Sequence, residues 1–503
     1  MNPIAVLITI AAYFTILFTV SYVAGRKADN AGFFTGNRKS SWYVVAFAMI
    51  GSSISGVTYV SVPGMVASSS FGYLQMVLGF VAGQLVIAFV LTPLFYRMNL
   101  VSIYEYLEER FGMCSYRTGA WFFFVSKMLG ASVRLYLVCL TLQLLVFEPF
   151  GLPFLLNVAV TVLLVWLYTF RGGVKSLIWT DSLKTFCLVV SVALCIYYIA
   201  SNLGLSFSGM VGAIADSGMS RIFFFDDVNS KQYFFKQFLA GAFTMIAMTG
   251  LDQDMMQRNL SCRNSKDAQK NMITSAISQF FIILLFLMLG VLLYLFADRQ
   301  GIQVGRSDEL FPLVATSRFF PAVVGILFLI GLISSAYSAA GSAMTALTTS
   351  FTVDILGTKE RTEAEVVKMR KRVHVGMATL MGITIFIFHL LNSTSVIDAV
   401  YILASYTYGP ILGMFAFGIF MKQPVRDRYI PLVTLLSPVL CFVLQKNSEV
   451  WFNGYQFSYE LLILNALFTF VGLCLLVRRN GKWKMERGKW GMEKGKGEWK
   501  IGQ

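Results

Sequence analysis

Long apolar segments recur along the chain, and short polar segments separate them. A run of ~20 apolar residues is enough to cross a membrane as a helix. Such spans are predicted at residues 4–24, 42–68, 73–96, 119–147, 153–170, 178–200, 236–257, 271–297, 319–350, 373–391, 396–420, 429–446 and 458–477. The pattern predicts an all-α polytopic membrane protein with about thirteen transmembrane helices. The first span lacks a basic leader and a small-residue cleavage site, so we expect it to be a retained helix.

Two of the predicted spans contain polar and small residues where a membrane helix is normally most apolar. They are "FAMIGSSISGVTYVSVPG" at 47–64 and "FLAGAFTMIAMTGLDQD" at 238–254. A broken helix is tolerated in a membrane only where its freed backbone groups lie inside protein or face a wet cavity. Helix packing is the alternative, because small residues recur every fourth position in the first segment. Two interruptions five spans apart favour an inverted five-plus-five repeat with a binding site at its centre.

Composition and charge agree with a membrane protein. Hydrophobic residues make up 56% of the chain and charged residues 13%, with a net charge of +15. Lysine and arginine concentrate in the loops on one side and in the tail after Arg478. By the positive-inside rule, the N-terminus is expected outside and the C-terminus in the cytoplasm. This distribution explains the basic net charge, so we predict no nucleic-acid partner. We expect the protein to be embedded in a lipid bilayer.

Catalytic motifs are not found in the sequence. The seven cysteines are scattered without a CxxC pair or a ligand-like cluster, so they indicate neither a disulfide nor a metal site. No nucleophile with a neighbouring base, P-loop or dinucleotide fingerprint is found. We therefore predict that the protein is not an enzyme and carries no cofactor.

Charged residues inside the spans are the next candidates for function. Lys127 and Arg134 lie in the fourth span, and Lys184 lies beside Asp181 in the sixth. Both lysines are close enough to the cytoplasmic end to reach the interface with their long side chains. Arg134 lies near the middle of its span, where an arginine costs ~2.5–3.5 kcal/mol. It therefore needs a partner, which is either the substrate or a set of backbone carbonyls.

The ninth predicted span carries an adjacent serine pair, Ser334 and Ser335, in "GLISSAYSAAGSAMTALTTSFTVDI" at 331–355. Neighbouring helical residues point about 100° apart, so the pair cannot belong to one packing seam. Hard cations bind several oxygen ligands from hydroxyls and carbonyls. A serine pair that faces a helix break is therefore a candidate ion site.

The chain resembles the sodium:solute symporter family, which has the LeuT-type inverted repeat. The resemblance covers roughly residues 5–475 and rests on five segments: "GNRKSSWYVVAFAMIGSSISG" at 36–56, "SIYEYLEERFG" at 102–112, "RGGVKSLIWTDSLK" at 171–184, "GLDQDMMQRNLSCRN" at 250–264 and the 331–355 segment. It implies a Na+ site formed by the carbonyls of Gly51, Ile54 and Gly331 and the hydroxyls of Ser334 and Ser335. A second Na+ in some members implies a further site at Asp181 and Ser338, although Tyr337 replaces a small hydroxyl residue there.

The resemblance also suggests a substrate. Arg134 matches an arginine that pairs with the substrate carboxylate in the sialic-acid branch, and Ser53, Ser55 and Thr58 match its hydroxyl positions. The sugar branch fits less well, because Val77 and the pair Met248–Thr249 replace its polar and aromatic contacts. The resemblance thus implies a Na+-coupled symporter of the bacterial cytoplasmic membrane that imports a small organic anion, with sialic acid (N-acetylneuraminate) as the leading candidate. The alternatives are another carboxylate (a monocarboxylate, amino acid or vitamin), a sugar, a channel, or a sodium or solute sensor built on a transporter fold.

The expected organisation has four parts, and the sequence leaves the oligomeric state open. They are an additional N-terminal transmembrane helix with an inner loop (1–41), an inverted-repeat transport core (42–421), two C-terminal transmembrane helices (422–477) and a basic cytoplasmic tail (478–503).

Overall fold

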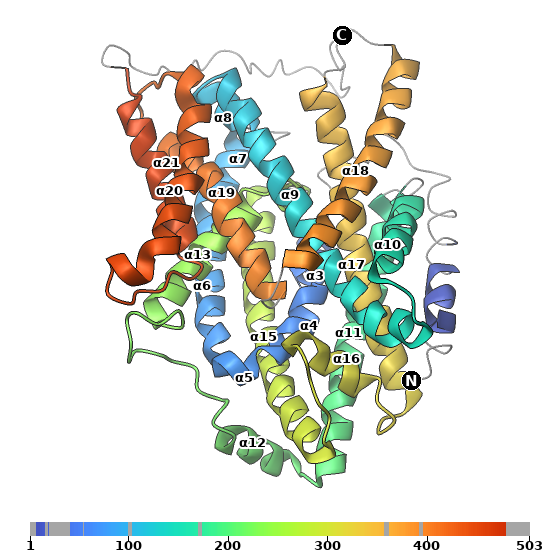
Figure 1. Ribbon diagram of the computed structural model, residues 1–503. Helices are drawn as coiled ribbons and strands as arrows, with labels where there is room; N and C mark the ends of the chain where they lie inside the picture. Colours follow the sequence, from blue (N-terminus) through green and yellow to red (C-terminus); the bar gives the residue numbers. More distant parts are fainter. Residues whose placement is uncertain are drawn as a thin grey trace.

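The computed structural model describes residues 7–15, 19, 41–53, 55–98, 103–169, 174–356, 362–391 and 396–478. Over these ranges the chain is a helical bundle, in which most long helices run along one common direction (Figure 1). Within them, the one strand-like pairing is an isolated antiparallel bridge between Val425 and Val477. The described α-helices from residue 42 onward are α3 (Trp42–Ser53), α4 (Gly56–Gly64), α5 (Val66–Ser69), α6 (Tyr73–Val86), α7 (Thr92–Met98), α8 (Glu105–Arg110), α9 (Met113–Leu142), α10 (Phe154–Thr169), α11 (Val174–Leu203), α12 (Phe207–Asp216), α13 (Phe234–Met245), α14 (Gln253–Leu260), α15 (Ser265–Gln300), α16 (Leu310–Ala315), α17 (Ala322–Ser350), α18 (Glu363–Leu391), α19 (Val396–Phe420), α20 (Ile430–Trp451) and α21 (Leu461–Leu475).

The apolar helices fall where the hydrophobic pattern places membrane spans. In the described part of the chain, 7 helices are long and apolar enough to cross a membrane, or up to 10 if each bent pair of helices counts as one span. Two shorter apolar helices lie at Phe154–Leu167 and Leu461–Leu475. The first predicted span is described only at 7–15 and 19. The prediction of membrane-spanning helices is therefore confirmed, whereas the count of thirteen is not.

Both spans with polar interruptions are broken. The segments Val45–Gly51 and Gly56–Gly64 meet at 49°, and Phe234–Gly250 and Gln253–Leu260 meet at 71°. The second half of each broken span begins with a side-chain cap. The hydroxyl of Ser55 accepts from the amide of Thr58 at 3.3 Å, and the carboxylate of Asp252 accepts from the amide of Met255 at 3.2 Å. These caps satisfy amide groups that a helix start leaves free, and they fix where each new half-helix begins.

A turn of π-helix precedes the second break. It spans Ile246–Gly250 and directly follows α13. A π-turn holds an extra residue within the helix and is frequent at functional sites. Here it carries Met248 and Thr249, both of which line the cavity described below. The interruption visible in the sequence thus corresponds to a change of helix type followed by a break.

Close helix contacts hold the broken spans in place. A methyl group at Gly79 of α6 would overlap the carbonyl oxygen of Phe238 on α13, and one at Gly241 of α13 would overlap the carbonyl oxygen of Met76 on α6. Small residues permit such backbone approach between membrane helices. Because α13 leads into the π-turn and the second break, this contact sets the position of that half of the site.

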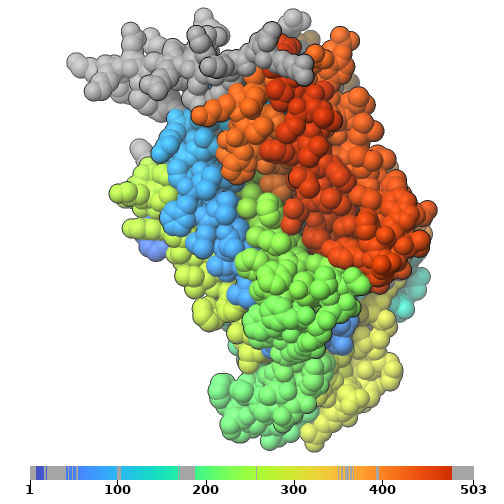
Figure 2. Space-filling model, turned by 90° about the vertical axis from the view of Figure 1, so that its left-hand side faces the viewer, coloured from blue at the N-terminus to red at the C-terminus, as the bar shows by residue number. Residues whose placement is uncertain are grey.

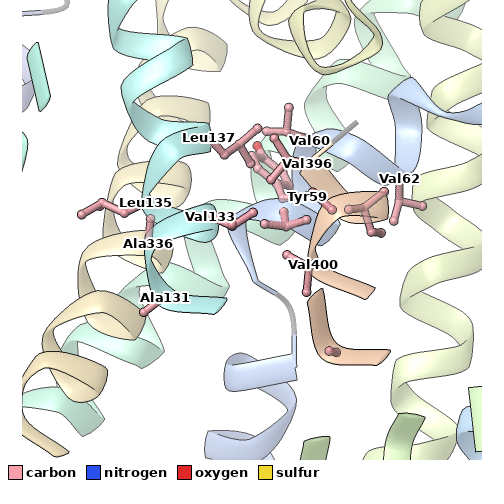
Figure 3. Close-up of a cluster of buried hydrophobic side chains, with 14 of the residues drawn as sticks. Tyr59, Val60, Val62, Ala131, Val133, Leu135, Leu137, Ala336, Val396 and Val400 are labelled. Atoms are coloured by element: carbon pink, nitrogen blue, oxygen red, sulfur yellow. The ribbon is translucent and has the colours of Figure 1, made fainter. Parts of the chain in front are cut away.

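A buried apolar cluster lies beside the first break (Figure 3). Tyr59 and Val60 of α4 meet Val133 and Leu137 of α9 and Val400 of α19, and all five side chains are buried. Side chains packed in this way interdigitate with few voids and resist displacement. The cluster therefore holds α4 against α9 and α19, immediately past the capped start of α4.

The helices α20 and α21 pack together at one edge of the bundle, with α21 against α19 and α13. Figure 2 shows them as a red layer along this edge, next to the green segments that precede α14. Cavity-lining residues come from the capped start and body of α4, from α6, α9, α13, α14, α15, α17 and α19, and from the π-turn between α13 and α14. The two C-terminal helices therefore lie outside the cavity wall.

Candidate functional site

A cavity of about 150 Å³ lies where the two broken spans approach α9, α17 and α19. Its polar lining residues are Ser55, Thr58, Tyr73, Lys127, Arg134, Thr244, Thr249, Asp254, Arg258, Gln279, Ser335, Ser338, Ser342 and Tyr401. Apolar residues, among them Phe80, Met248, Ile283 and Val400, complete the wall. A concave pocket in which polar groups converge between apolar side chains is the usual form of a small-molecule site.

Three of the four predicted substrate residues line this cavity: Ser55, Thr58 and Arg134. The hydroxyls of Ser55 and Thr58 lie 3.2 Å apart at the capped start of α4. The backbone of Ser53 ends α3 on the other side of the break, while its side chain lies outside the described atoms. The structure thus brings the hydroxyl pair and the arginine to one space, although they are far apart in the sequence.

Arg134 is half-buried in the cavity wall and forms neither a hydrogen bond nor an ion pair with the residues that the structure describes. The sequence left open that it caps backbone carbonyls, and no described carbonyl accepts from it. A guanidinium has five N–H donors and no acceptor. Those donors are therefore available to a molecule in the cavity.

The predicted ion-site residues of α17 lie beside the first break. A methyl group at Gly56 would lie 3.2 Å from Leu332 Cδ1 and 3.9 Å from Ser335 Cβ, so the start of α4 approaches α17 at the serine pair. Ser335 lines the cavity. The hydroxyl of Ser334 is buried and has no hydrogen-bond partner in the described chain. A buried polar atom without a partner costs ~1–3 kcal/mol, and a hydroxyl of this kind fits a hard-cation ligand.

The remaining predicted Na+ ligands are described less completely. Gly51 is buried in the last turns of α3, and Ile54 lies outside the described residues. Gly331 lies one turn before Ser335 on α17, and a methyl group there would lie 2.9 Å from Leu188 Cδ2 on α11. Its lack of a side chain thus permits the close approach of α11 to α17. The structure leaves the roles of the three carbonyls as predictions.

The predicted second Na+ site falls between α11 and α17. The backbone of Asp181 lies in α11, but its side chain is outside the described atoms. Ser338 lines the cavity one turn beyond Ser334. Tyr337 is fully buried, and its ring contacts that of Phe14 at 4.9 Å. It points toward the N-terminal helix, so the unexpected tyrosine does not fill the cavity.

The sequence led us to expect that the Lys127 side chain extends to the membrane interface. Its ammonium is instead paired within the protein, 3.2 Å from both carboxylate oxygens of Asp252 and 3.5 Å from Asp254. The side chains of Lys127 and Asp252 are only 10% and 4% exposed. Asp254 in turn pairs with Arg258 at 3.5 Å, and the hydroxyl of Tyr408 donates to Asp252 at 3.0 Å. The attraction between these groups and the hydrogen bond from Tyr408 offset part of the cost of burying the charges.

These features define the class of the protein: a membrane bundle with two broken spans around a central polar cavity is the architecture of a secondary transporter. More specifically, the chain belongs to the sodium:solute symporter family, whose model matches residues 33–426. Members of this family are Na+-coupled transporters and not enzymes, with Na+ as the coupling ion.

Relatives in the family transport different solutes. The chain is 26% identical to the human sodium/iodide cotransporter over 80% of its own length and 63% of that protein, so it spans less than two thirds of this relative. It is 23% identical to the sodium/sialic acid symporter NanT of Aliivibrio fischeri over 92% of both chains. It is 25% identical to mouse sodium-coupled monocarboxylate transporter 1 over 79% of its length and 66% of that protein. Sequence similarity alone therefore does not determine the substrate.

Solved structures share the fold. A Na+-coupled sialic acid symporter in a substrate-bound outward-open state superposes with a TM-score of 0.76 at 18% identity, covering 95% of this chain and 99% of that one. Mhp1, a nucleobase-cation-symport-1 family transporter, gives a TM-score of 0.51 at 13% identity, covering 87% and 92% of the two chains. At these identities the likeness concerns the fold and not the substrate.

Proposed function

We propose that this chain is a Na+-coupled symporter that imports a small organic monoanion across the bacterial cytoplasmic membrane. The observation that carries this proposal is the charge in and beside the cavity. Lys127, Arg134 and Arg258 supply three cationic side chains, whereas Asp252 and Asp254 supply two carboxylates. Both carboxylates are already paired with Lys127 or Arg258. Arg134 is the cation left over among the described side chains, so the site carries one positive charge that a monoanion would neutralise.

A carboxylate is the anion that suits Arg134 best. Arginine and carboxylate form two parallel hydrogen bonds, and charge-assisted bonds of this type are roughly twice as strong as neutral ones. The planar guanidinium also fixes the orientation of the acid, which an ammonium group does not. The hydroxyls of Ser55 and Thr58 line the same space and suit a second polar group on the substrate.

The size of the cavity favours a short acid. A cavity of about 150 Å³ is the volume that binds benzene in an engineered protein core, a ligand of about six non-hydrogen atoms. Short monocarboxylates are of that size, whereas N-acetylneuraminate is larger and would extend through the open side of the cavity. We therefore place a short monocarboxylate first and keep sialic acid, the leading candidate from the sequence, as the second substrate to test.

The coupling ion is assigned to the first break. In this proposal the carbonyls of Gly51, Ile54 and Gly331 and the hydroxyls of Ser334 and Ser335 bind Na+, supported by the buried, unpartnered Ser334 hydroxyl. A second Na+ binds at Asp181 and Ser338. The core of residues 42–421 forms the five-plus-five repeat, supported by the two broken spans. Further spans flank this repeat and bring the total to about thirteen, with the N-terminus outside and the basic tail in the cytoplasm.

Uptake into proteoliposomes tests this function. The purified protein is given an inward Na+ gradient, or K+ in its place, and radiolabelled lactate, pyruvate, propionate, N-acetylneuraminate, iodide or galactose. We expect accumulation of a carboxylate above its external concentration only with Na+. Equilibration without accumulation would indicate a channel, and binding without uptake would indicate a sensor. Uptake of the neutral sugar instead of an acid would contradict the anion proposal.

A further inference from the structure

The ion cluster of Lys127, Asp252, Asp254 and Arg258 joins separate parts of the transporter. Lys127 belongs to α9, whereas both carboxylates lie at the second break, one as the cap of α14 and one inside its first turn. Tyr408 of α19 donates to Asp252 as well. Lys127 and Asp252 are buried, Asp254 and Arg258 are partly buried, and three of the four members also line the cavity. Because this cluster lies at a helix break beside the cavity, it affects both the packing of the helices and the net charge of the site.

The cluster shares the cavity with Arg134. Lys127 precedes Arg134 by two turns of α9, about 10 Å along the helix axis, and Asp254 lines the same cavity as both. Charges interact far more strongly in such a low-dielectric space than in water. A carboxylate released from its cation would therefore compete with the substrate for Arg134. Whether Asp252 and Asp254 are paired with Lys127 and Arg258 therefore decides whether Arg134 is available to bind the substrate.

We propose that Lys127 is a specificity-determining residue that sets the charge of the substrate this transporter accepts. By holding Asp252 and Asp254, it keeps the site one positive charge in excess and leaves Arg134 for the substrate carboxylate. In this role it acts through the two carboxylates that its ammonium binds, so it is a positioning residue. The inference rests on the proposed function, because it concerns the anion preference of the same site.

Substitutions that change the charge count separate this role from simple packing. Lys127→Met leaves two cations against two carboxylates and removes the excess charge. Asp252→Asn alone raises the excess by one. The double variant Lys127→Met/Asp252→Asn restores the original excess although it has lost the ion pair. If Lys127 only supported the fold, the double variant would be no better than Lys127→Met.

The expected results follow from these counts. Lys127→Met should weaken binding of the acid by about tenfold or more, as expected when groups in one charged network are coupled, while binding of a neutral amide changes little. The double variant should recover the affinity for the acid to within about threefold of wild type. Lys127→Arg, which keeps the charge, should retain the preference for the acid over its amide.

Lys236 provides a matched control. It is also a buried lysine, but it donates to the carbonyls of Asn229 and Gln456 and lies over the ring of Tyr455 at 3.5 Å, away from the cavity lining. Lys236→Met removes a buried ammonium of the same kind. It should change thermal stability without changing the ratio of acid to amide affinity.

The experiment measures binding of lactate, pyruvate and propionate, each beside its amide, by calorimetry on detergent-purified protein in saturating Na+, with thermal unfolding of the substrate-free variants alongside. A wild-type protein that binds none of these acids, nor N-acetylneuraminate beside its amide, contradicts both the proposed function and the inference. If the wild-type protein prefers the acid and a folded Lys127→Met protein keeps the same preference, the inference is wrong but the proposed function stands. The same holds if the double variant fails to recover acid binding while it remains folded.

Discussion

The hydroxyl groups of Tyr73 and Tyr401 lie 2.6 Å apart and join α6 to α19 at the wall of the cavity. The ring of Tyr401 also contacts that of Tyr459 at 5.1 Å, and the Tyr459 hydroxyl donates to Asp398. The ring of Phe80 packs against the rings of both Tyr73 and Tyr401. A transporter has to expose its site to each side in turn, so contacts that close one end belong to one of its two states.

We predict that the contact between Tyr73 and Tyr401 closes one end of the cavity, so Tyr73→Phe should shift the equilibrium away from this closed state. The substitution removes one hydrogen bond and leaves the partly buried Tyr401 hydroxyl without this partner, at a cost of ~0.5–1.5 kcal/mol. We therefore expect about a two- to tenfold increase in labelling of a cysteine placed at Phe80 by a membrane-impermeant thiol reagent. The background carries Cys114→Ser and Cys474→Ser, because these two cysteines are not buried. Unchanged labelling would show that the tyrosine pair does not close the cavity.

Tyr106→Phe is the control for loss of a tyrosine hydroxyl. The Tyr106 ring stacks on Phe415 of α19 at 5.2 Å, and the residue does not line the cavity. This variant should leave the labelling of the cysteine at position 80 unchanged. An equal increase in both variants would indicate general loosening of the bundle.

Ser334→Ala and Ser335→Ala should each raise the Na+ concentration needed for half-maximal uptake. A hard cation loses an oxygen ligand that the helix break cannot replace. Thr345→Ala is the control on the same helix, because its hydroxyl donates to the carbonyl of Gly341 within α17. Na+ activation curves of uptake distinguish the three variants. If both serine variants follow the wild-type curve, the serine pair is not part of the ion site.

Asp181→Asn should reduce the dependence of uptake on membrane potential more than it reduces substrate affinity. A monoanion that moves with one Na+ carries no net charge, whereas a second Na+ adds ~2.3 kcal/mol of driving force per 100 mV. Uptake in proteoliposomes under imposed K+ diffusion potentials measures this dependence. Wild-type uptake that ignores the potential would exclude the second Na+.

Gly79→Ala and Gly241→Ala should destabilise the fold. At both positions an added methyl group overlaps a backbone carbonyl of the facing helix, so α6 and α13 have to separate, at a cost of ~1–3 kcal/mol. Gly212→Ala on α12 is the control, because no atom lies within 4 Å of its added methyl group. Thermal unfolding in detergent should show lower midpoints for the first two variants only. Wild-type midpoints for Gly79→Ala would mean that the helices do not approach as closely as described.

Sequence reasoning predicted the parts of this structure that depend on local pattern. Apolar runs give the membrane helices, and polar interruptions give the two breaks, because a membrane tolerates irregular backbone only in special surroundings. The pattern could not show that Lys127 pairs with Asp252, because the two residues are separated by 125 positions and meet only through packing. The "GLDQD" segment at the second break offered one signal, since carboxylates at membrane depth need a cation. The count of spans remains a prediction, because the start of the chain is described only in part.

The response of Arg134 variants tests the anion proposal most directly. Arg134→Ala should weaken binding of the transported acid by ~2–5 kcal/mol, as for a broken buried charge pair, which is a factor of about 30 or more in affinity. Arg134→Lys should restore binding only in part. The decisive measurement compares binding of the acid with that of its amide, beside thermal unfolding of the substrate-free protein. We predict that Arg134→Ala loses the preference for the acid without a lower unfolding temperature. An Arg134→Ala protein that unfolds at a lower temperature yet binds the acid as wild type does would show that the arginine is structural, and would contradict the anion proposal.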